Sequence, residues 1–168
     1  IRAGIDTIEH ASLVDDEGIK LAVARKQPVW FSMDIFNTDY TQAEGKKNGV
    51  LEDNLRKDRE VAQIQRDNFR KAHAAGVRMV FGTDAGVMPH GTAAGQFRVM
   101  VEYGMTPIEA IRAATVNAAE ALGRSKDVGV IAVGRYGDLV AVEGDPLKDV
   151  RVLASVKAVI KGGKLVSD

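Results

Sequence analysis

Three short β-like runs, each followed by a helical pattern, most constrain how this chain can fold. The runs that predict strands are Asp6–His10, Pro28–Met33 and Val77–Phe81. The second and third are rich in apolar and β-branched residues, whereas the first is short and ends in polar residues. The helical patterns that follow them are residues 15–26, Leu51–Ala75 and Gly95–Tyr103. Three strand–helix units in succession predict an α/β fold with parallel strands.

The glycine-rich stretch Phe81–Gly91 follows the third strand and contains the carboxylate Asp84. Ligands of parallel α/β proteins bind beyond the carboxyl ends of the strands, so Asp84 is placed where chemistry usually occurs. Gly82 and Gly86 allow the backbone to turn sharply and to approach a ligand closely. An Asp at this position can also cap the following turn, and the local pattern leaves both interpretations open.

The composition excludes several classes of protein. The 168 residues carry 23 basic and 23 acidic side chains, so nothing indicates a nucleic-acid-binding surface or a polybasic membrane surface. Because there is no cysteine, neither a disulfide framework nor a thiolate metal site is available. No apolar run approaches the ~20 residues of a membrane span.

The chain begins at Ile1 without an initiator Met. Residues Ile1–Ile5 resemble the end of a helix, a glycine cap and the entry into a strand. We therefore expect the sequence to be cut from the interior of a longer chain. The absence of a leader consequently says nothing about localisation.

The second half of the chain changes character after Gly123. Before it, Thr106–Glu109 predicts a helix start with a capping box and a proline at the first helical position. After it come short β-like segments at residues 128–133, 138–143, 156–161 and 164–166. Gly162-Gly163 lies between the last two and predicts a hairpin. We expect two parts, an α/β part at residues 1–123 and a small β part at residues 124–168.

Residues 34–50 predict a long polar loop after the second strand. Tyr40 is its aromatic residue and is expected to be exposed. His73, near the end of the long charged helix, is likewise expected to lie on the surface without a functional role.

Several motifs in this order resemble the amidohydrolase superfamily, in its imidazolonepropionase-like and Xaa-Pro dipeptidase-like branch. The motifs are Ile8-Glu9-His10, Gly82-Thr83-Asp84-Ala85-Gly86, Thr106-Pro107-Ile108-Glu109-Ala110, and the segment from Gly134 through Asp138-Leu139-Val140 to Gly144-Asp145-Pro146-Leu147. Together they cover essentially the whole chain. The resemblance implies a metal-dependent (β/α)₈ TIM barrel with a small β-sandwich, in which the three strands here are barrel strands six, seven and eight. The tail would be the C-terminal strands of the sandwich.

The resemblance also implies roles for individual residues. His10 corresponds to the strand-six metal ligand, and Asp84 to the strand-eight Asp, which is both a metal ligand and the catalytic acid/base. His90 lies in a loop that is near the substrate in this branch. The chain lacks the family's His-x-His and its strand-four and strand-five ligands, and a complete barrel needs ~250 residues. We therefore expect a C-terminal portion that is inactive alone, or that binds metal weakly.

The reaction implied by the resemblance is hydrolysis of an amide bond in a small substrate, with dipeptides first. A divalent metal, one or two ions in the complete enzyme and by default Zn²⁺, lowers the pKa of bound water and polarises the carbonyl. Asp84 would take the proton of that water and pass it to the leaving nitrogen. Glu9 has two possible roles. Either it does not bind the metal itself but orients one of the residues that do, or it is a solvated glutamate.

Two other interpretations belong to different classes. The chain could be a non-catalytic α/β module that serves assembly or binding. Alternatively, the loop Gly82–Gly86 could cradle a phosphate, although neither a dinucleotide fingerprint nor a P-loop Lys-Ser/Thr is present.

Assembly is expected as well. Three strands without the rest of a barrel leave sheet edges unpaired, and the inner face of Val29–Met33 and Val77–Phe81 is expected to be apolar and bare. We therefore expect a homo-oligomer, most simply a two-fold dimer.

Overall fold

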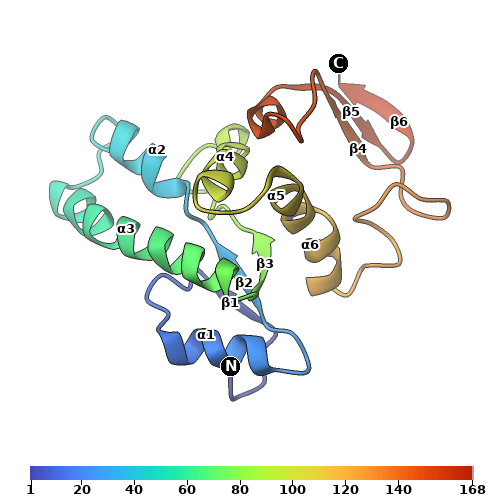
Figure 1. The fold of residues 1–168 in the computed structure, drawn as a ribbon. Helices are drawn as coiled ribbons and strands as arrows, with labels where there is room; N and C mark the ends of the chain where they lie inside the picture. The colour runs from blue at the N-terminus through green and yellow to red at the C-terminus, as the bar shows by residue number, and fades with distance from the viewer. Residues whose placement is uncertain (168) are drawn as a thin grey trace.

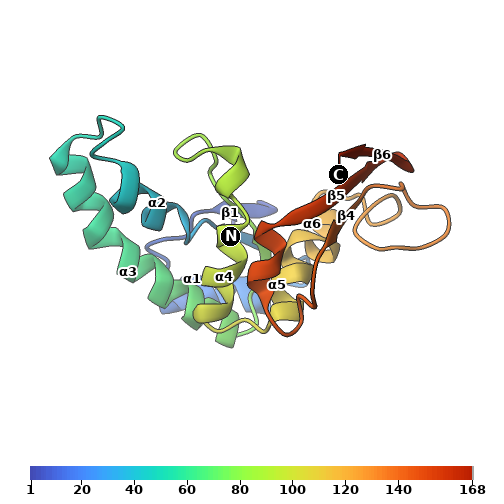
Figure 2. The same cartoon turned by 90° about the horizontal axis from the view of Figure 1, so that it is seen from above.

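The computed structural model describes residues 1–167, which form two three-stranded sheets joined and covered by helices (Figure 1; Figure 2). In chain order the elements are β1 (Thr7–Glu9), α1 (Asp16–Ala24), β2 (Trp30–Met33), α2 (Asn37–Glu44), α3 (Glu52–Ala74), β3 (Arg78–Phe81), η1 (His90–Thr92), α4 (Gly95–Glu102), α5 (Pro107–Ala114), α6 (Val116–Ala121), β4 (Leu139–Val142), η2 (Val150–Ala154), β5 (Val156–Lys161) and β6 (Lys164–Ser167).

The first sheet is parallel, with strand order β1-β2-β3. Helix α1 connects β1 to β2, and α2 with α3 connects β2 to β3. Parallel neighbours require such crossover connections, which is why each strand is followed by a helix. The prediction of a parallel α/β fold is therefore confirmed. The numbering of these strands as six, seven and eight of a barrel stays a prediction.

The register places different residues on the two faces of this sheet. Ile8, Phe31 and Met79 are aligned on one face and belong to the core or pack against it. On the opposite face Glu9 is aligned with Ser32. The same face carries Val80, aligned with Ser32, and Trp30, which is buried. The expected inner face is therefore apolar only in part, and at Trp30 it is not bare.

The core lies between the parallel sheet and the helices packed on it. Its buried residues come mainly from β2, β3, α1, α3, α4 and α5, with Phe31 and Phe69 fully buried. The central strand β2 is the most buried strand, because it has a hydrogen-bonded neighbour on each side. Burying a side chain such as Phe31 contributes roughly 1.5–3 kcal/mol, so β2 is the principal anchor of this part of the molecule.

The expected long loop at residues 34–50 is wrong, because helix α2 occupies its first half. This helix packs on α3 mainly through polar contacts. The Thr38 hydroxyl donates to the Asp58 carboxylate at 2.6 Å, and the Gln42 side chain donates to the Leu55 carbonyl at 3.0 Å. A helix held by polar contacts has no apolar stripe, so hydrophobic periodicity cannot reveal it.

Tyr40 and His73 are both less exposed than expected. Tyr40 lies in α2, is half-buried, and its hydroxyl accepts a hydrogen bond from Asn48 at 3.3 Å. His73 is half-buried near the end of α3, where its ring stacks on Phe69 with centroids 6.5 Å apart. Its Nε2 lies 3.6 Å from a carboxylate oxygen of Glu109. The contact with Glu109 of α5 accounts for the difference at His73, because that partner is distant in the sequence.

The helix that begins at Thr106 is confirmed at its start and broken in its middle. The capping box between Thr106 and Glu109 is formed. Thr115 separates α5 from α6 with φ −124° and ψ −86°, and its hydroxyl donates to the Ile111 carbonyl at 2.8 Å. A Thr that bonds back to the preceding turn while its own backbone leaves the helical region explains the break.

The tail forms an antiparallel sheet with strand order β4-β5-β6. The predicted hairpin at Gly162-Gly163 is confirmed, and both glycines have positive φ, 57° and 78°, as the tightest hairpin turns require. The strand expected at residues 128–133 is wrong. That segment is irregular, and Gly129 lies so close to α6 that an added Cβ would meet Ala119 at 2.7 Å.

The tail contacts the first part of the chain through η2, which packs against α4. The division at residue 123 stays a prediction. Within residues 1–167, every helix is too short or too polar to cross a membrane.

Candidate metal centre at the strand ends

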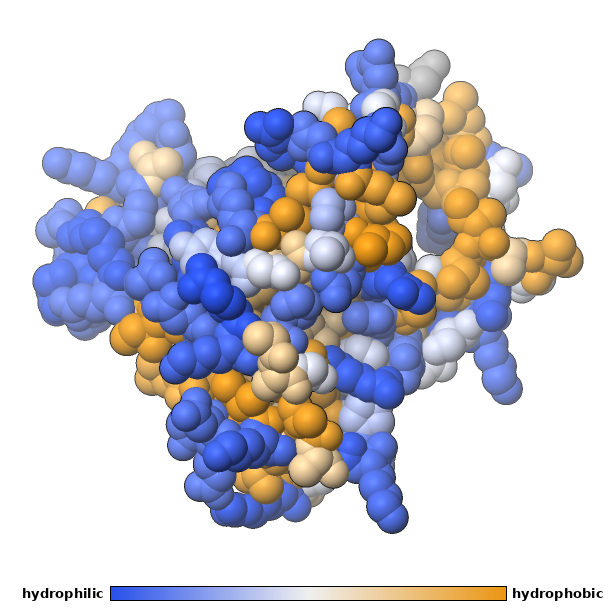
Figure 3. All heavy atoms as spheres, in the orientation of Figure 1, coloured by the Kyte–Doolittle hydropathy of each residue, from blue (hydrophilic) through white to orange (hydrophobic). Residues whose placement is uncertain are grey.

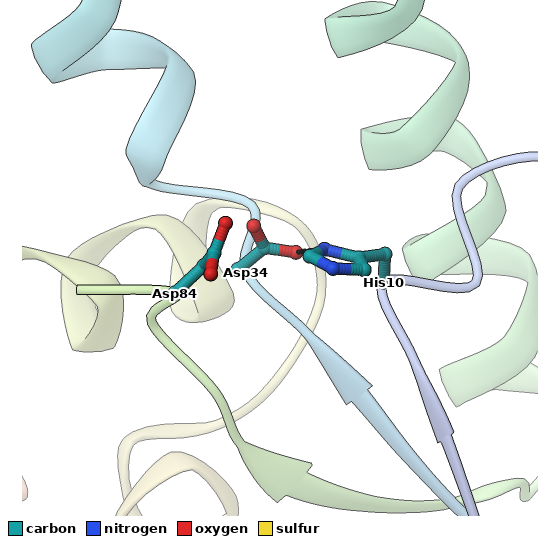
Figure 4. A group of neighbouring side chains, drawn as sticks. All are labelled: His10, Asp34 and Asp84. Carbon is teal, nitrogen blue, oxygen red and sulfur yellow. Dashed lines mark hydrogen bonds and ion pairs between the residues drawn. The ribbon is translucent and has the colours of Figure 1, made fainter. Parts of the chain in front are cut away.

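The three parallel strands deliver a polar side chain each to the same edge of the sheet. His10 follows β1, Asp34 follows β2, and Asp84 comes shortly after β3. Figure 4 shows the three side chains converging there, with Asp34 between the other two. Because the carboxyl ends of parallel strands share one edge, residues 74 positions apart become neighbours.

The three side chains are close enough to bind one ion. One ligand atom from each of His10, Asp34 and Asp84 lies within 4.8 Å of the others. His10 Nδ1 and Asp34 Oδ1 are 2.8 Å apart and form a hydrogen bond. Imidazole nitrogen and carboxylate oxygen are ligands that zinc accepts, so the donor set fits a divalent metal of that kind.

A small cavity opens at this edge, with a volume of about 140 Å³. Its lining residues are Glu9, His10, Ser32, Asp34, Gly82, Thr83 and Asp84. A volume of this size holds an ion and a few water molecules rather than a whole substrate. Gly82 keeps the cavity narrow, because its backbone approaches β2 so closely that an added Cβ would meet Ser32 Oγ at 2.4 Å.

Backbone strain is concentrated at the same place. Among residues 1–167, His10, Ala11 and Asp84 are the non-glycine residues with positive φ, at 63°, 45° and 46°. Such a conformation costs on the order of 1–3 kcal/mol for a residue with a Cβ, and it persists only where the surroundings hold it. Two of the three strained residues are the predicted metal ligands, which supports a functional role for this edge.

Electrostatics at the cluster favour positive charge. The hydrogen bond to Asp34 raises the pKa of His10 above its ordinary value of 6.5, and the charge of Asp34 adds to this effect. Partial desolvation of the ring opposes the shift, and the charges of Asp84 and Glu9 add smaller increases. A cation is therefore attracted to this edge, whether it is a proton on His10 or a metal ion.

The structure brings some of the predicted site residues together and leaves others apart. His10 and Asp84 meet at the strand ends, as the resemblance implied. His90 lies on η1, is exposed, and does not line this cavity, so its contact with a substrate stays a prediction. Glu9 is exposed and lines the cavity, which leaves both interpretations of it open.

Asp34 was missed by the sequence analysis, which placed it at the start of a loop. It is only 5% exposed. The sequence signal that could have identified Asp34 is a carboxylate immediately after an apolar strand. The same signal identified Asp84 as a candidate.

The loop Gly82–Gly86 does not have the form of a phosphate cradle. The Gly86 amide donates to the Met88 carbonyl at 3.2 Å, and the Val87 amide donates to the Asp84 carbonyl at 3.3 Å. The Gly86 amide is therefore not free to bind an anion, and the Asp84 carboxylate would repel one.

Comparisons with known proteins identify related sequences and structures. A profile of the Amidohydrolase family matches residues 1–166. The crystal structure of a Xaa-Pro dipeptidase with bound methionine in its active site superposes with a TM-score of 0.90 and 36% identity, over 99% of this chain and 41% of that one. Ochratoxinase from Aspergillus niger is 33% identical over 98% of this chain and 34% of its own length.

A third relative is similar over a shorter stretch. Adenine deaminase 2 from Agrobacterium fabrum is 49% identical over 72 residues, which are 42% of this chain and 12% of that protein. The chain thus spans about a third of the length of the ochratoxinase and about two fifths of that of the dipeptidase.

Proposed function

Because this chain belongs to the amidohydrolase family, whose members hydrolyse C–N bonds, we propose that it carries part of the active site of a metal-dependent hydrolase. The substrates proposed are small amides, with dipeptides first. The observation that carries the proposal is the meeting of His10 and Asp84 beside a small cavity at the carboxyl edge of the parallel sheet. In barrels built from such units, catalytic residues lie at this edge.

His10 and Asp84 would hold the metal, with zinc as the proposed ion. When bound, a divalent metal supplies an activated water and polarises the scissile carbonyl. The Asp84 carboxylate is exposed to the cavity, so it can accept a proton from the attacking water and deliver it to the leaving nitrogen. His90 is proposed to contact the substrate from the loop between β3 and α4.

The relatives support amide hydrolysis more than any other reaction. One similar structure is described as a Xaa-Pro dipeptidase and a similar curated protein as an ochratoxinase, and both similarities extend over nearly the whole chain. The similarity to an adenine deaminase is confined to 72 residues. Dipeptides and N-acyl amino acids are therefore the first substrates to test, and adenine is the comparison substrate.

The three strands β1–β3 are proposed to be strands six to eight of a (β/α)₈ barrel, with residues 124–168 as part of a β-sandwich. His10 and Asp84 are fewer than the three protein ligands that a stable zinc site normally uses. Residues 1–168 alone are consequently expected to be inactive or to bind metal weakly. Hydrolysis is proposed for a protein of the length of the relatives.

The first test uses the full-length protein that contains this sequence. His10→Ala and Asp84→Asn are each expected to lower turnover of dipeptides by at least about 100-fold, since each removes a group that no neighbour replaces. Metal content, measured by elemental analysis, is expected to fall with His10→Ala. Asp53→Asn, which removes an exposed carboxylate in the first turn of α3 that pairs with Arg56 and does not line the cavity, is the matched control and should leave both quantities unchanged.

The rival proposal is a non-catalytic α/β module for assembly or binding. It predicts a full-length protein without bound metal at these residues and without turnover of any amide in the panel. Near-normal turnover in both variants would overturn the assignment of His10 and Asp84. Turnover of adenine alone would overturn the substrate class.

Self-association, expected from the sequence to pair exposed strand edges, is also proposed to involve the tail. A groove of about 480 Å³ lies between α5 and the tail and is lined largely by apolar residues. The tail also exposes large apolar side chains, among them Ile131 and Val140. A second copy of the chain, joined by a two-fold axis, is the proposed occupant.

A further inference from the structure

The buried carboxylate of Asp34 contacts the ring of the candidate metal ligand His10. We propose that Asp34 is a positioning residue that holds the imidazole of His10 in one tautomer, with Nδ1 carrying the proton and Nε2 left for the metal. This inference rests on the proposed function, because it assigns His10 a metal to bind. Nothing in the family match or in the described relatives assigns a role to Asp34.

The hydrogen bonds of Asp34 show that both of its carboxylate oxygens act as acceptors. Its Oδ1 accepts from Gln65 Nε2 at 3.1 Å, and its Oδ2 accepts from Asn37 Nδ2 at 2.7 Å. Both donors are amide groups, so the carboxylate acts as an acceptor on both oxygens. Since both oxygens already accept hydrogen bonds, we assign Asp34 as the acceptor toward His10 as well, with Nδ1, 2.8 Å from its Oδ1, as the donor.

This assignment determines the tautomer of His10. In a neutral imidazole one nitrogen is the donor and the other the acceptor. When Nδ1 donates to Asp34, Nε2 keeps its lone pair, and no residue within 1–167 forms a hydrogen bond to it. A carboxylate that orients a metal-binding histidine through its second nitrogen is a general device, which fixes the ring and raises its basicity.

The backbone around Asp34 is held independently of the metal site. Gln96 of α4 is fully buried, and it bonds to the chain on both sides of Asp34. Its Nε2 donates to the Met33 carbonyl at 2.6 Å, and its Oε1 accepts from the Phe36 amide at 2.9 Å. The position of Asp34 is thus set by a clamp that needs neither His10 nor an ion.

The alternative role for Asp34 is that of a third metal ligand, because its carboxylate lies within the same 4.8 Å group. The contacts argue against this role. Oδ1 already receives two donors and Oδ2 one, so one of its roughly four lone-pair sites remains. Asp84 carries no such set of donors and faces the cavity, which makes it the better ligand.

The decisive experiment measures the tautomer in the metal-free, full-length protein. Long-range nitrogen–proton correlation spectra of protein labelled with ¹⁵N-histidine distinguish the two neutral tautomers. His10 is expected to carry its proton on Nδ1, and Asp34→Ala is expected to produce a mixture of tautomers. A wild-type His10 protonated on Nε2 overturns the inference even if every Asp34 variant fails to fold.

Metal affinity provides the second arm, with Zn²⁺ and Co²⁺ as probes in competition with a chelator. Asp34→Ala is expected to weaken binding by about 10–100-fold, the usual effect of removing a group that orients a ligand. Asp39→Asn is the matched control: Asp39 is a carboxylate of the neighbouring α2 that pairs with Arg66 and Arg98 and does not contact His10. Its metal affinity should stay within about twofold of the wild type.

The Co²⁺ absorption spectrum separates positioning from ligation. The band intensities, which report the number of ligands, are expected to be the same in the wild type and in Asp34→Ala once each is saturated with Co²⁺. A changed coordination number would show that Asp34 is a ligand and would overturn the inference. Unchanged affinity in Asp34→Ala would also overturn it. Failure of the wild type to bind either metal would instead refute the proposed function, while the tautomer measurement still decides the role of Asp34.

Discussion

The parallel sheet and the tail sheet differ sharply in how much of their surface this chain covers. The strand β2 is enclosed on both sides, and Phe31 at its centre is fully buried. In the tail, β4 and β6 expose Val140 and Leu165 by about 60% each. Within residues 1–167, Val150 is the sole buried hydrophobic residue of the tail. Figure 3 shows the corresponding apolar surface along the tail side of the molecule.

This difference teaches that the two parts obtain stability in different ways. The parallel sheet is packed by helices that lie next to its strands in the sequence, so local units supply most of its core. The tail strands pair with each other, but a sheet with an uncovered apolar face is marginal by itself. His10 and Asp84 are consequently positioned by the parallel sheet and its helices. The dense packing of this part can maintain the strained backbone at the two residues.

The largest expected effect tests this contrast in packing. Phe31→Ala should lower the free energy of unfolding by about 3–5 kcal/mol, because it leaves a cavity in a filled core. Leu165→Ala should change it by less than about 0.5 kcal/mol, because that side chain is largely exposed. Urea unfolding of the two variants, followed by circular dichroism, measures both. A loss above about 2 kcal/mol for Leu165→Ala would mean that its face is covered in the folded protein.

The elements that could be predicted from the sequence belong mostly to the well-packed parallel sheet and its helices. The strands β1–β3 and the helix α3 were predictable, because apolar runs and an apolar stripe mark elements that pack on a core. The places of His10 and Asp84 after their strands were predictable, whereas their roles were implied by the resemblance and stay predictions. Asp34 follows a strand in the same way, but the polar residues after it favoured a loop.

The remaining errors have physical causes that a single sequence does not display. Helix α2 is held by hydrogen bonds from Thr38 and Gln42 to α3, and the identity of those partners depends on tertiary structure. The break at Thr115 likewise depends on a side chain that bonds back to Ile111. The burial of His73 arises from contact with Glu109, which is 36 residues away in the chain.

The second prediction concerns the exposed face of the tail. Replacing Ile131 by Ser and Val140 by Thr removes apolar surface from the groove beside α5. If a second copy covers this groove, the double change should weaken self-association by at least about tenfold, since burial of one such side chain contributes roughly 1.5–3 kcal/mol. Light scattering across a micromolar concentration series measures the effect.

The matched control is Leu13→Ser, which changes an exposed apolar residue near α1 that does not line the groove. Its dissociation constant should equal that of the wild type. A wild-type protein that stays monomeric at all concentrations would refute the proposed assembly.

The smallest expected effect concerns pH and the start of α5, which packs against the parallel sheet. The Thr106 backbone amide, donating to Glu109 at 2.7 Å, holds the pKa of that carboxyl below its ordinary value of 4.5. The Thr106 hydroxyl adds to this effect, partial desolvation opposes it, and His73 contributes a further lowering. The ionised carboxylate therefore stabilises the folded state. That contribution is complete above the unfolded pKa and is lost as pH falls through the folded one.

Glu109→Gln removes this pH-dependent term and should make stability less sensitive to acid. Because the Glu109 side chain is about half exposed, the difference from the wild type at about pH 7 should be no more than about 0.5 kcal/mol. The two proteins should converge in a second measurement at acidic pH, once the pH has fallen through the lowered folded pKa of Glu109 and the wild-type carboxyl is protonated. Glu60→Gln, an exposed glutamate of α3 paired with Arg56, serves as the control for loss of a surface charge. Urea unfolding at both pH values measures the difference in the free energy of unfolding. If this difference is the same at the lower pH, the effect of Glu109→Gln does not depend on the charge of the carboxylate.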